Sequence, residues 1–549
     1  MDKSVLEKSR IGKGVLFWVV VLGVLLRAIS AWTAWSIRGD GCGYLEMARG
    51  FSDGDPSLFI SKLQHPLFPA LISWTHAFVG DWILSGWLVG LVAGAVAIVL
   101  AWFLCLEVAG RREALFGASL VAVHPLLIEG VGGILTESVY IAATLGAVYG
   151  IVWSCRQMRV RGVIFGGIAA GISYLTRPEG GMVGVLLVSY LLVRVWRTRS
   201  LLTGLGYAAL FSSALMGVAL PLIVTLSVAN GYPTLSGKKF SSVFADWSWG
   251  PGYLVEEGTP SPVVQELATR YVAKIRDKNR SIPALPQRVE QDIQGLDETG
   301  YTRASHSKIE KRGDPFLEKL FKSWHPVFFI LIGLGLFVPK RWSPRVHEES
   351  LFLTLFFGLL GVLAYVNHRE GYVSSRHLVA VGILLVPWAA RGLSVAGENW
   401  MLRSFGRWSR TSALPQQSHR ALGLALFVSI SLLVLAGKAV KKQGRSGWVS
   451  RQCGEKIAAT VQPDDRIMTS DGRASFYAGG QFLRVPVWGG YAKLIEILID
   501  QSVDYLILAP GDQFKVRELI DMGWLREIQS TPDRKKNLWR TYTVELKDP

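Results

Sequence analysis

The sequence predicts a polytopic α-helical membrane protein with a small C-terminal α/β domain. Half of its 549 residues are hydrophobic. They gather in runs of about 18 or more residues with few charges, which is the length that crosses a bilayer. Short basic links separate many of these runs, as expected of cytoplasmic loops. After residue 447 the pattern changes to short apolar stretches that alternate with amphipathic ones, which is typical of a small α/β domain.

The apolar runs predict about eleven spans with the N-terminus in the cytoplasm. The first run is Val15–Trp32, and basic residues precede it. The others cover residues 83–108, 114–128, 134–153, 163–176, 180–195, 202–228, 327–338, 351–366, 378–390 and 421–440. The runs at 114–128, 163–176 and 327–338 are short, so tilted or broken helices are expected there.

This count gives a transmembrane domain at residues 1–440 and an extracytoplasmic domain at residues 447–549. The outer loop 34–82 and the long outer loop 230–325 lie on the same side as the C-terminal domain. In that domain the pattern predicts buried strands at residues 466–470 and 504–508. It predicts amphipathic helices at residues 491–501 and 512–522.

The formal net charge of +17 does not indicate nucleic-acid binding. Many of the basic residues sit in short links, where they set topology, and no compact basic face interleaves with exposed aromatic residues. The chain also has no zinc-binding CxxC or HExxH motif, no GxSxG nucleophile elbow and no phosphate-binding loop motif.

Asp40 lies just beyond the first span, in glycine-rich sequence, with Tyr44 and Ala48 at helical spacing behind it. An ionisable residue beside a span is costly, which makes it a candidate for function. Its carboxylate could take a proton from an acceptor or hold a metal ion. Alternatively, Asp40 caps the helix that begins near Tyr44.

Two further motifs place charges at the ends of spans. Glu137 follows Thr136 at the start of an apolar run. It could be a second carboxylate of a site, or it could simply favour the positive end of the helix dipole. In Arg177-Pro178-Glu179 the proline ends a helix, and Arg177 could bind a phosphate or pair with Glu179 in a turn.

Arg376 and His377 stand where an outer loop enters a span. A guanidinium there suits a lipid-linked phosphate, although arginines at helix ends also snorkel to the interface. Three His-Pro pairs, which begin at His65, His124 and His325, open or interrupt apolar runs. They could ligate a metal, but a turn before a helix explains them more simply. On the predicted topology all these motifs face the outer side.

The order of the motifs resembles the membrane glycosyltransferases of the GT-C fold, on the branch of protein O-mannosyltransferases and bacterial aminoarabinose transferases. The matching pieces lie between about residues 15 and 400. They are Asp40 with Tyr44 and Ala48, His65 to Pro69, Pro125 with Thr136-Glu137, Thr176 to Glu179, and Arg376-His377-Leu378.

The resemblance implies a polyprenyl-phosphate-linked sugar donor, and transfer to a glycan, lipid or protein on the outer face of a plasma (inner) membrane. It makes Asp40 the catalytic base, Glu137 its partner and Arg376 a contact of the donor phosphate, which Arg177 would help to neutralise. Tyr44, His65, Glu179 and His377 would bind substrate. A divalent metal ion could be held by Asp40 and Glu137.

Two departures from the family concern Glu137, which stands where many relatives have aspartate, and loop 230–325, in which no family motif can be mapped.

The main alternative is a transporter or flippase of a lipid-linked saccharide, which would favour charges deep within helices and paired halves. A non-catalytic membrane scaffold would not need Asp40, Glu137 and Arg376 to converge. A ligase or polymerase of long glycans fits the motifs less well.

Overall fold

The protein forms two compact units, and each is described by itself. The structure is a computed structural model that describes residues 3–54, 65–157, 159–230, 232–235, 316–337, 346–370, 373–404, 447–485, 494, 497–498, 501–510, 516, 519–520, 523–533 and 537–545. The first unit is helical and holds the described residues up to 34 and from 43 to 404. The second unit holds residues 35–42 and the described residues from 447 onwards.

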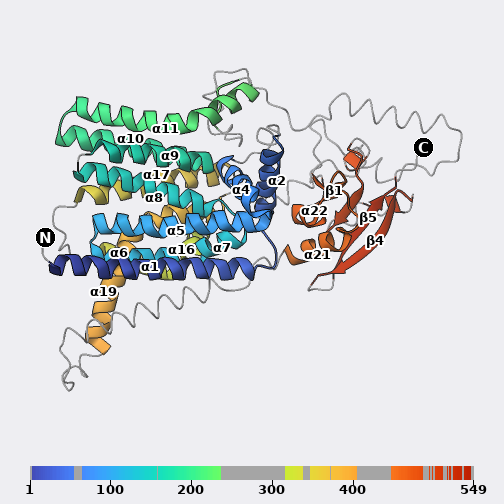
Figure 1. Cartoon of the computed structure of the whole chain (residues 1–549), viewed down its shortest axis with the longest axis horizontal. Coiled ribbons are helices and arrows are strands. Elements are labelled where there is room, and N and C mark those ends of the chain that lie inside the picture. The colour runs from blue at the N-terminus through green and yellow to red at the C-terminus, as the bar shows by residue number, and fades with distance from the viewer. Residues whose placement is uncertain are drawn as a thin grey trace. The chain divides into compact units, whose positions relative to one another are not determined.

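The first unit is a bundle of helices, many of which run side by side (Figure 1). The helices before residue 235 are α1 (Lys3–Trp32), α2 (Gly39–Asp53), α4 (Leu67–Val79), α5 (Trp82–Val108), α6 (Arg111–Val123), α7 (Pro125–Gly132), α8 (Glu137–Gln157), α9 (Val160–Thr176), α10 (Glu179–Thr198) and α11 (Leu201–Asn230). After residue 315 follow α16 (Phe316–Phe337), α17 (Val346–Glu370), α18 (Ser375–Ile383) and α19 (Val386–Ser404). The first residues of α2 belong to the second unit, and the rest of this helix belongs to the bundle.

The helices confirm a polytopic membrane protein. Within the described residues, seven helices are long and apolar enough to cross a membrane, and two bent pairs bring the number to at most nine. One bent pair, α6 with α7, covers the short predicted run 114–128, and α9 is the short helix expected at 163–176. The predicted count of about eleven stays a prediction, because the last run, 421–440, lies outside the described residues.

The structure moves two predicted boundaries. α16 begins at Phe316, inside the predicted outer loop 230–325, so the short run 327–338 is the second part of a longer helix that is kinked at His325. α17 continues to Glu370, so the first part of the predicted outer loop 367–376 is helical. In both places polar residues extend a helix beyond its apolar run, because backbone hydrogen bonds do not require apolar side chains.

Glycines bring α8 and α9 into close contact. A Cβ atom at Gly150 would lie 2.7 Å from the carbonyl oxygen of Gly162, and one at Gly162 would lie 2.8 Å from the carbonyl oxygen of Gly150. Small residues at such an interface let two membrane helices approach at backbone distance. This contact fixes α8 and α9 as a pair; α8 carries residues of the site described below, and Arg177 of that site directly follows α9.

Arg27, in α1, supports the break between α6 and α7. Its side chain is almost fully buried, and it donates hydrogen bonds to the carbonyl oxygens of Ala122 at 2.8 Å and Val121 at 3.0 Å. These carbonyls belong to the last turn of α6, which has no partners for them within the helix. Pro125, the first residue of α7, has no N–H group to offer Val121. The buried guanidinium therefore satisfies the carbonyls that the broken helix leaves unpaired.

Replacement of Arg27 by methionine is expected to lower the stability of the bundle by roughly 1–3 kcal/mol, because two buried carbonyl groups lose their donors. Thermal unfolding of the purified protein in detergent would measure this change. The matched control is Arg197→Met, at an exposed arginine near the end of α10. An Arg27→Met melting temperature equal to the wild-type value would show that the break does not need this arginine.

The second unit contains a five-stranded sheet with strand order β2-β1-β3-β5-β4. The strands are β1 (Arg466–Thr469), β2 (Gln481–Arg484), β3 (Tyr505–Leu508), β4 (Leu525–Pro532) and β5 (Leu538–Val544), and the helices are α21 (Trp448–Ile457) and α22 (Gly472–Ala478). β1 pairs in parallel with β2 and β3, whereas β5 pairs antiparallel with β3 and β4. The predicted strands at 466–470 and 504–508 are confirmed, and most residues of the predicted helices at 491–501 and 512–522 lie outside the described ones.

A partly buried ion pair follows β1, and Ser450 links it to α21. The carboxylate of Asp471 accepts hydrogen bonds from Arg473 Nε at 2.8 Å and from the Ser450 hydroxyl at 2.5 Å. Burial raises the pKa of Asp471, but the hydrogen bonds and charge of Arg473 and the hydroxyl of Ser450 lower it by more, so that the pKa lies below its ordinary value. The ionised form is therefore favoured in the folded unit.

The Asp471 pair is expected to make the second unit less stable in acid. Because the pKa of Asp471 is lower in the folded state, its contribution is complete above the unfolded pKa of about 3.9 and is lost as the pH falls through the folded value. Unfolding at pH values from 7 down to 2.5 should show a smaller loss of stability in Asp471→Asn than in wild type. The exposed Asp464, changed to asparagine, is the control. Parallel pH curves for wild type and Asp471→Asn would contradict this account.

Candidate active site

Five ionisable residues predicted from the sequence come together in the first unit. Glu137 is the first residue of α8, Arg177 follows α9, and Glu179 is the first residue of α10. Arg376 and His377 lie in the first turn of α18. Residues that are far apart in the chain thus meet where helices begin or end, and we call these five residues the charge cluster.

Arg177 is the centre of the charge cluster. Its Nη1 lies 3.4 Å from Glu137 Oε1, and its Nε lies 3.4 Å from Glu179 Oε2. The side chains of Arg177 and Glu137 are 10% and 5% exposed. Ions this well shielded need partners, because an unpaired buried charge is costly. Arg177 therefore holds the starts of α8 and α10 together.

Arg376 and His377 bring α18 to the same carboxylates. Arg376 Nη1 lies 3.8 Å from Glu137 Oε1, and its side chain is 27% exposed, more than that of Arg177. His377 Nε2 lies 3.5 Å from Glu179 Oε1. The backbone N–H of Ser374 donates to His377 Nδ1, which makes Nδ1 an acceptor and leaves Nε2 to carry the proton. Glu179 is the partner towards which that proton points.

Glu137 has an asymmetric environment. Its Oε1 faces both Arg177 and Arg376, whereas its Oε2 is buried and has no hydrogen-bond partner among the described residues. A buried carboxylate oxygen without a donor is unfavourable. This oxygen therefore keeps its capacity to accept a hydrogen bond unused among the described residues.

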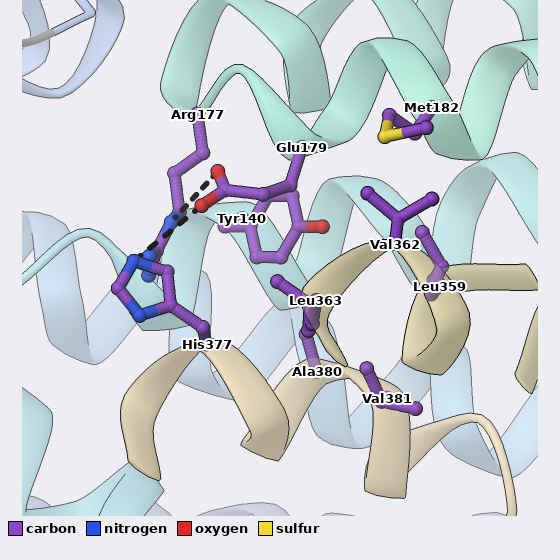
Figure 2. Close-up of a pocket in the computed structure, with 10 residues that line it drawn as sticks. All are labelled: Tyr140, Arg177, Glu179, Met182, Leu359, Val362, Leu363, His377, Ala380 and Val381. Carbon is purple, nitrogen blue, oxygen red and sulfur yellow. Dashed lines mark hydrogen bonds and ion pairs between the residues drawn. The ribbon is translucent and has the colours of Figure 1, made fainter. Parts of the chain in front are cut away.

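A pocket extends from the charge cluster into apolar surroundings (Figure 2). One end is formed by Arg177, Glu179 and His377, with the Tyr140 ring beside them. The remaining walls come from α10, α17 and α18 and consist of aliphatic side chains and one methionine, namely Met182, Leu359, Val362, Leu363, Ala380 and Val381. A pocket with ionic groups at one end and apolar walls beyond them suits a molecule that has a charged head and a hydrocarbon tail.

Tyr140 belongs to this site although the sequence analysis did not select it. The Arg177 guanidinium carbon lies 5.5 Å from the centre of its ring, a cation–π distance. Tyr140 is three residues after Glu137 in α8, so both side chains project from one face of the helix. That spacing was the available signal, but a tyrosine in an apolar span is usually part of the packing.

Asp40 lies in the first turn of α2 and is exposed. It belongs to the second unit, so it is described apart from the charge cluster. Tyr44, further along α2 and half-buried, packs edge-to-face on Phe68 with the ring centres 5.3 Å apart. The predicted catalytic role of Asp40 and the predicted substrate contact of Tyr44 stay predictions.

His65 is buried just before α4, and its Nδ1 makes a 2.6 Å hydrogen bond with the carbonyl oxygen of Tyr174 in α9. This bond ties the start of α4 to α9, which is the turn-before-helix arrangement considered for the His-Pro pairs. His124 ends α6 and His325 marks the kink of α16, so each pair does open or interrupt a helix. The predicted substrate contact of His65 stays a prediction.

The structure shows no further ligands for the metal ion predicted at Asp40 and Glu137 within the described residues. Within the part of the chain that the structure describes, no three His, Cys, Asp or Glu side chains gather as metal ligands would. Glu137 Oε1 faces two arginines, which is the environment of a counter-ion. The predicted divalent metal ion stays a prediction.

The fold and the charge cluster define an integral-membrane protein whose polar site is built from the ends of its helices. Residues 64–224 match the family model described as dolichyl-phosphate-mannose-protein mannosyltransferase. No curated protein matches the chain in sequence.

Solved structures of membrane glycosyltransferases share the fold. The archaeal oligosaccharyltransferase AglB from Archaeoglobus fulgidus, solved with an inhibitory peptide and a dolichol-phosphate, aligns with a TM-score of 0.60 at 12% identity, over 99% of this chain and 75% of its own. ArnT from Cupriavidus metallidurans, bound to undecaprenyl phosphate, aligns with a TM-score of 0.54 at 13% identity, over 97% of this chain and 99% of its own. An AglB structure with zinc and sulfate aligns with a TM-score of 0.57 at 12% identity, over 96% of this chain and 72% of its own. The chain thus shares the GT-C fold of these membrane glycosyltransferases, the fold that the order of its motifs predicted.

Arg177→Gln is expected to destabilise the bundle by roughly 3 kcal/mol, because two shielded carboxylates lose their cation. Adding Glu137→Gln should restore part of the loss by removing one of the unpaired charges. The control is Arg156→Gln, which breaks the more exposed pair with Glu107 and should cost at most about 1 kcal/mol. Thermal unfolding in detergent measures all three, and equal losses in Arg177→Gln and Arg156→Gln would contradict the central role of Arg177.

Proposed function

We propose that the protein transfers a sugar from a polyprenyl-phosphate donor to an extracytoplasmic acceptor. The observation that carries this proposal is the pocket in which Arg177, Glu179 and His377 form one end and aliphatic residues form the walls. A polyprenyl phosphate has the same order, with an ionic head and a long hydrocarbon tail. The dolichol-phosphate in AglB and the undecaprenyl phosphate in ArnT support a donor of this class.

In this proposal Arg376 and Arg177 bind the donor phosphate. The guanidinium group suits phosphate because it offers parallel N–H donors and keeps its charge. Arg376 is the more exposed of the two and lies further from Glu137, so it can turn towards a phosphate at less cost. His377, whose Nε2 faces Glu179, can donate to the same head group.

The transfer step needs a base and a stabilised leaving group. The acceptor hydroxyl or amine attacks the anomeric carbon, and its proton passes to Asp40. The bond between that carbon and the phosphate oxygen breaks, and its electron pair leaves with the polyprenyl phosphate. Arg376 and Arg177 stabilise the charge that develops on this oxygen. Glu137 Oε2 accepts a hydrogen bond from the acceptor or from the sugar.

The reaction is placed on the outer face of the plasma (inner) membrane, with the N-terminus in the cytoplasm and the C-terminal domain outside. This orientation follows from the basic links between spans. The acceptor is a glycan, a lipid or a protein, and the sugar is a hexose or a pentose.

Asp40→Asn is expected to lower kcat at least about 100-fold, because asparagine cannot take a proton. Binding of the donor should not change. The assay follows transfer of radiolabelled sugars from polyprenyl phosphates to membrane lipids and envelope glycans of the host, with purified protein. Asp53→Asn, at the other and equally exposed end of α2, is the control.

If Asp40→Asn transfers sugar as fast as wild type, Asp40 only begins a helix and the proposed base is wrong. Wild type could instead bind the donor, transfer no sugar to any acceptor, and move lipid-linked saccharides across the membrane of vesicles that contain the protein. In that case a transporter or flippase becomes the better account.

A further inference from the structure

The segment just before Asp40 is held by side chains of α21 and α22. The hydroxyl oxygen of Tyr477 accepts a hydrogen bond of 3.2 Å from the backbone N–H of Ile37. Arg451 Nη1 donates to the carbonyl oxygen of Trp35 at 3.1 Å. The Trp35 ring packs edge-to-face on Trp448, with the ring centres 4.7 Å apart. We call Trp448, Arg451 and Tyr477 the clamp.

The clamp residues also order one another. Arg451 Nε lies 2.6 Å from Glu455 Oε1, and its guanidinium carbon lies 5.0 Å from the centre of the Tyr477 ring. A guanidinium with a carboxylate and an aromatic ring as neighbours loses much of its freedom, so little entropy remains to be lost when it binds Trp35. The clamp is therefore prepared to fix the backbone of residues 35–37.

The burial of the neighbouring residues indicates how this fixation reaches Asp40. Ser36 and Ile37 are buried, Asp40 is exposed, and Cys42 is buried again. Residues 38–40 are thus a short exposed stretch between residues that are buried on both sides. Three residues of chain span at most about 10 Å. A displacement of Ile37 is therefore expected to displace the backbone of Asp40.

We propose that the clamp residues are positioning residues for Asp40. This inference rests on the proposed function, in which Asp40 is the base. A general base works only when its oxygen is within hydrogen-bond reach of the proton, and a misplacement of 1 Å can slow the reaction markedly. The C-terminal unit, in which the sequence showed no catalytic motif, would then act on catalysis through the segment 35–37.

The first test compares Tyr477→Phe and Arg451→Lys with wild type in the full-length protein. Each variant loses one hydrogen bond to the segment 35–37 and keeps the packing. We expect kcat to fall about fivefold, the rate equivalent of one hydrogen bond, with KM for the donor unchanged. The control is Tyr505→Phe, which removes a hydroxyl of the same unit that is bonded to Thr460 and is not part of the clamp. In an Asp40→Asn background the two clamp variants should lose no further activity.

Hydrogen–deuterium exchange provides a readout that does not depend on activity. The amides of residues 36–42 should exchange faster in Tyr477→Phe and Arg451→Lys than in wild type or Tyr505→Phe, while the strands of the sheet keep their protection. Unchanged exchange in this segment, or a wild-type kcat in both clamp variants while Asp40→Asn is inactive, would overturn the positioning role and leave the proposed function standing. An active Asp40→Asn would instead overturn the base assignment, whatever the exchange data show.

Discussion

The ion pairs of Arg177 are the interaction on which the site depends. Arg177 joins Glu137 at the start of α8 to Glu179 at the start of α10, and neither carboxylate is well hydrated. Helix starts carry a partial positive charge, which also favours a carboxylate there. With Arg376 added, the charge cluster contains two arginines and two glutamates, so it is neutral when His377 is neutral. In the proposed function, a donor phosphate competes with Glu137 for Arg376, whose contact with Glu137 is longer and whose side chain is more exposed than that of Arg177.

Broken helices allow such a site to exist inside an apolar bundle. A continuous membrane helix pairs its own backbone groups and offers only side chains to its neighbours. Proline interrupts this pattern, and Pro125, Pro178 and Pro326 each lie at a helix end or kink. The carbonyls that are freed need donors, and Arg27 provides them at the end of α6. α7 and the loop after it then lead to Glu137, so a buried charge in α1 supports the path of the chain into the site.

The sequence predicted the parts of this structure that depend on local pattern. Apolar runs located the spans, and charges at their ends identified Glu137, Arg177, Glu179, Arg376 and His377, which the structure brings together. Hydropathy did not locate the start of α16, because the residues from Phe316 to Trp324 include charged ones.

Contacts between residues far apart in the chain could not be predicted from the sequence, for a different reason. Nothing local distinguishes Tyr140 from a packing tyrosine, or shows that Arg27 of α1 meets two carbonyls more than ninety positions away. The hydrogen bonds from residues 35 and 37 to Arg451 and Tyr477 cross separations of 416 and 440 residues.

These distant contacts change how the C-terminal unit is understood. Judged by motifs alone, it is a small α/β domain that contains no catalytic motif. Its packing, however, includes residues 35–42, which come directly after the first span and contain Asp40. A glycine-rich segment is costly to order, because glycine loses the most conformational freedom on folding. Gly39, Gly41 and Gly43 flank Asp40 and Cys42, so the first turn of α2, which contains Asp40, is rich in residues that favour a helix poorly. Packing just before this turn adds to its order, and the described contacts that provide it at residues 35 and 37 belong to α21 and α22.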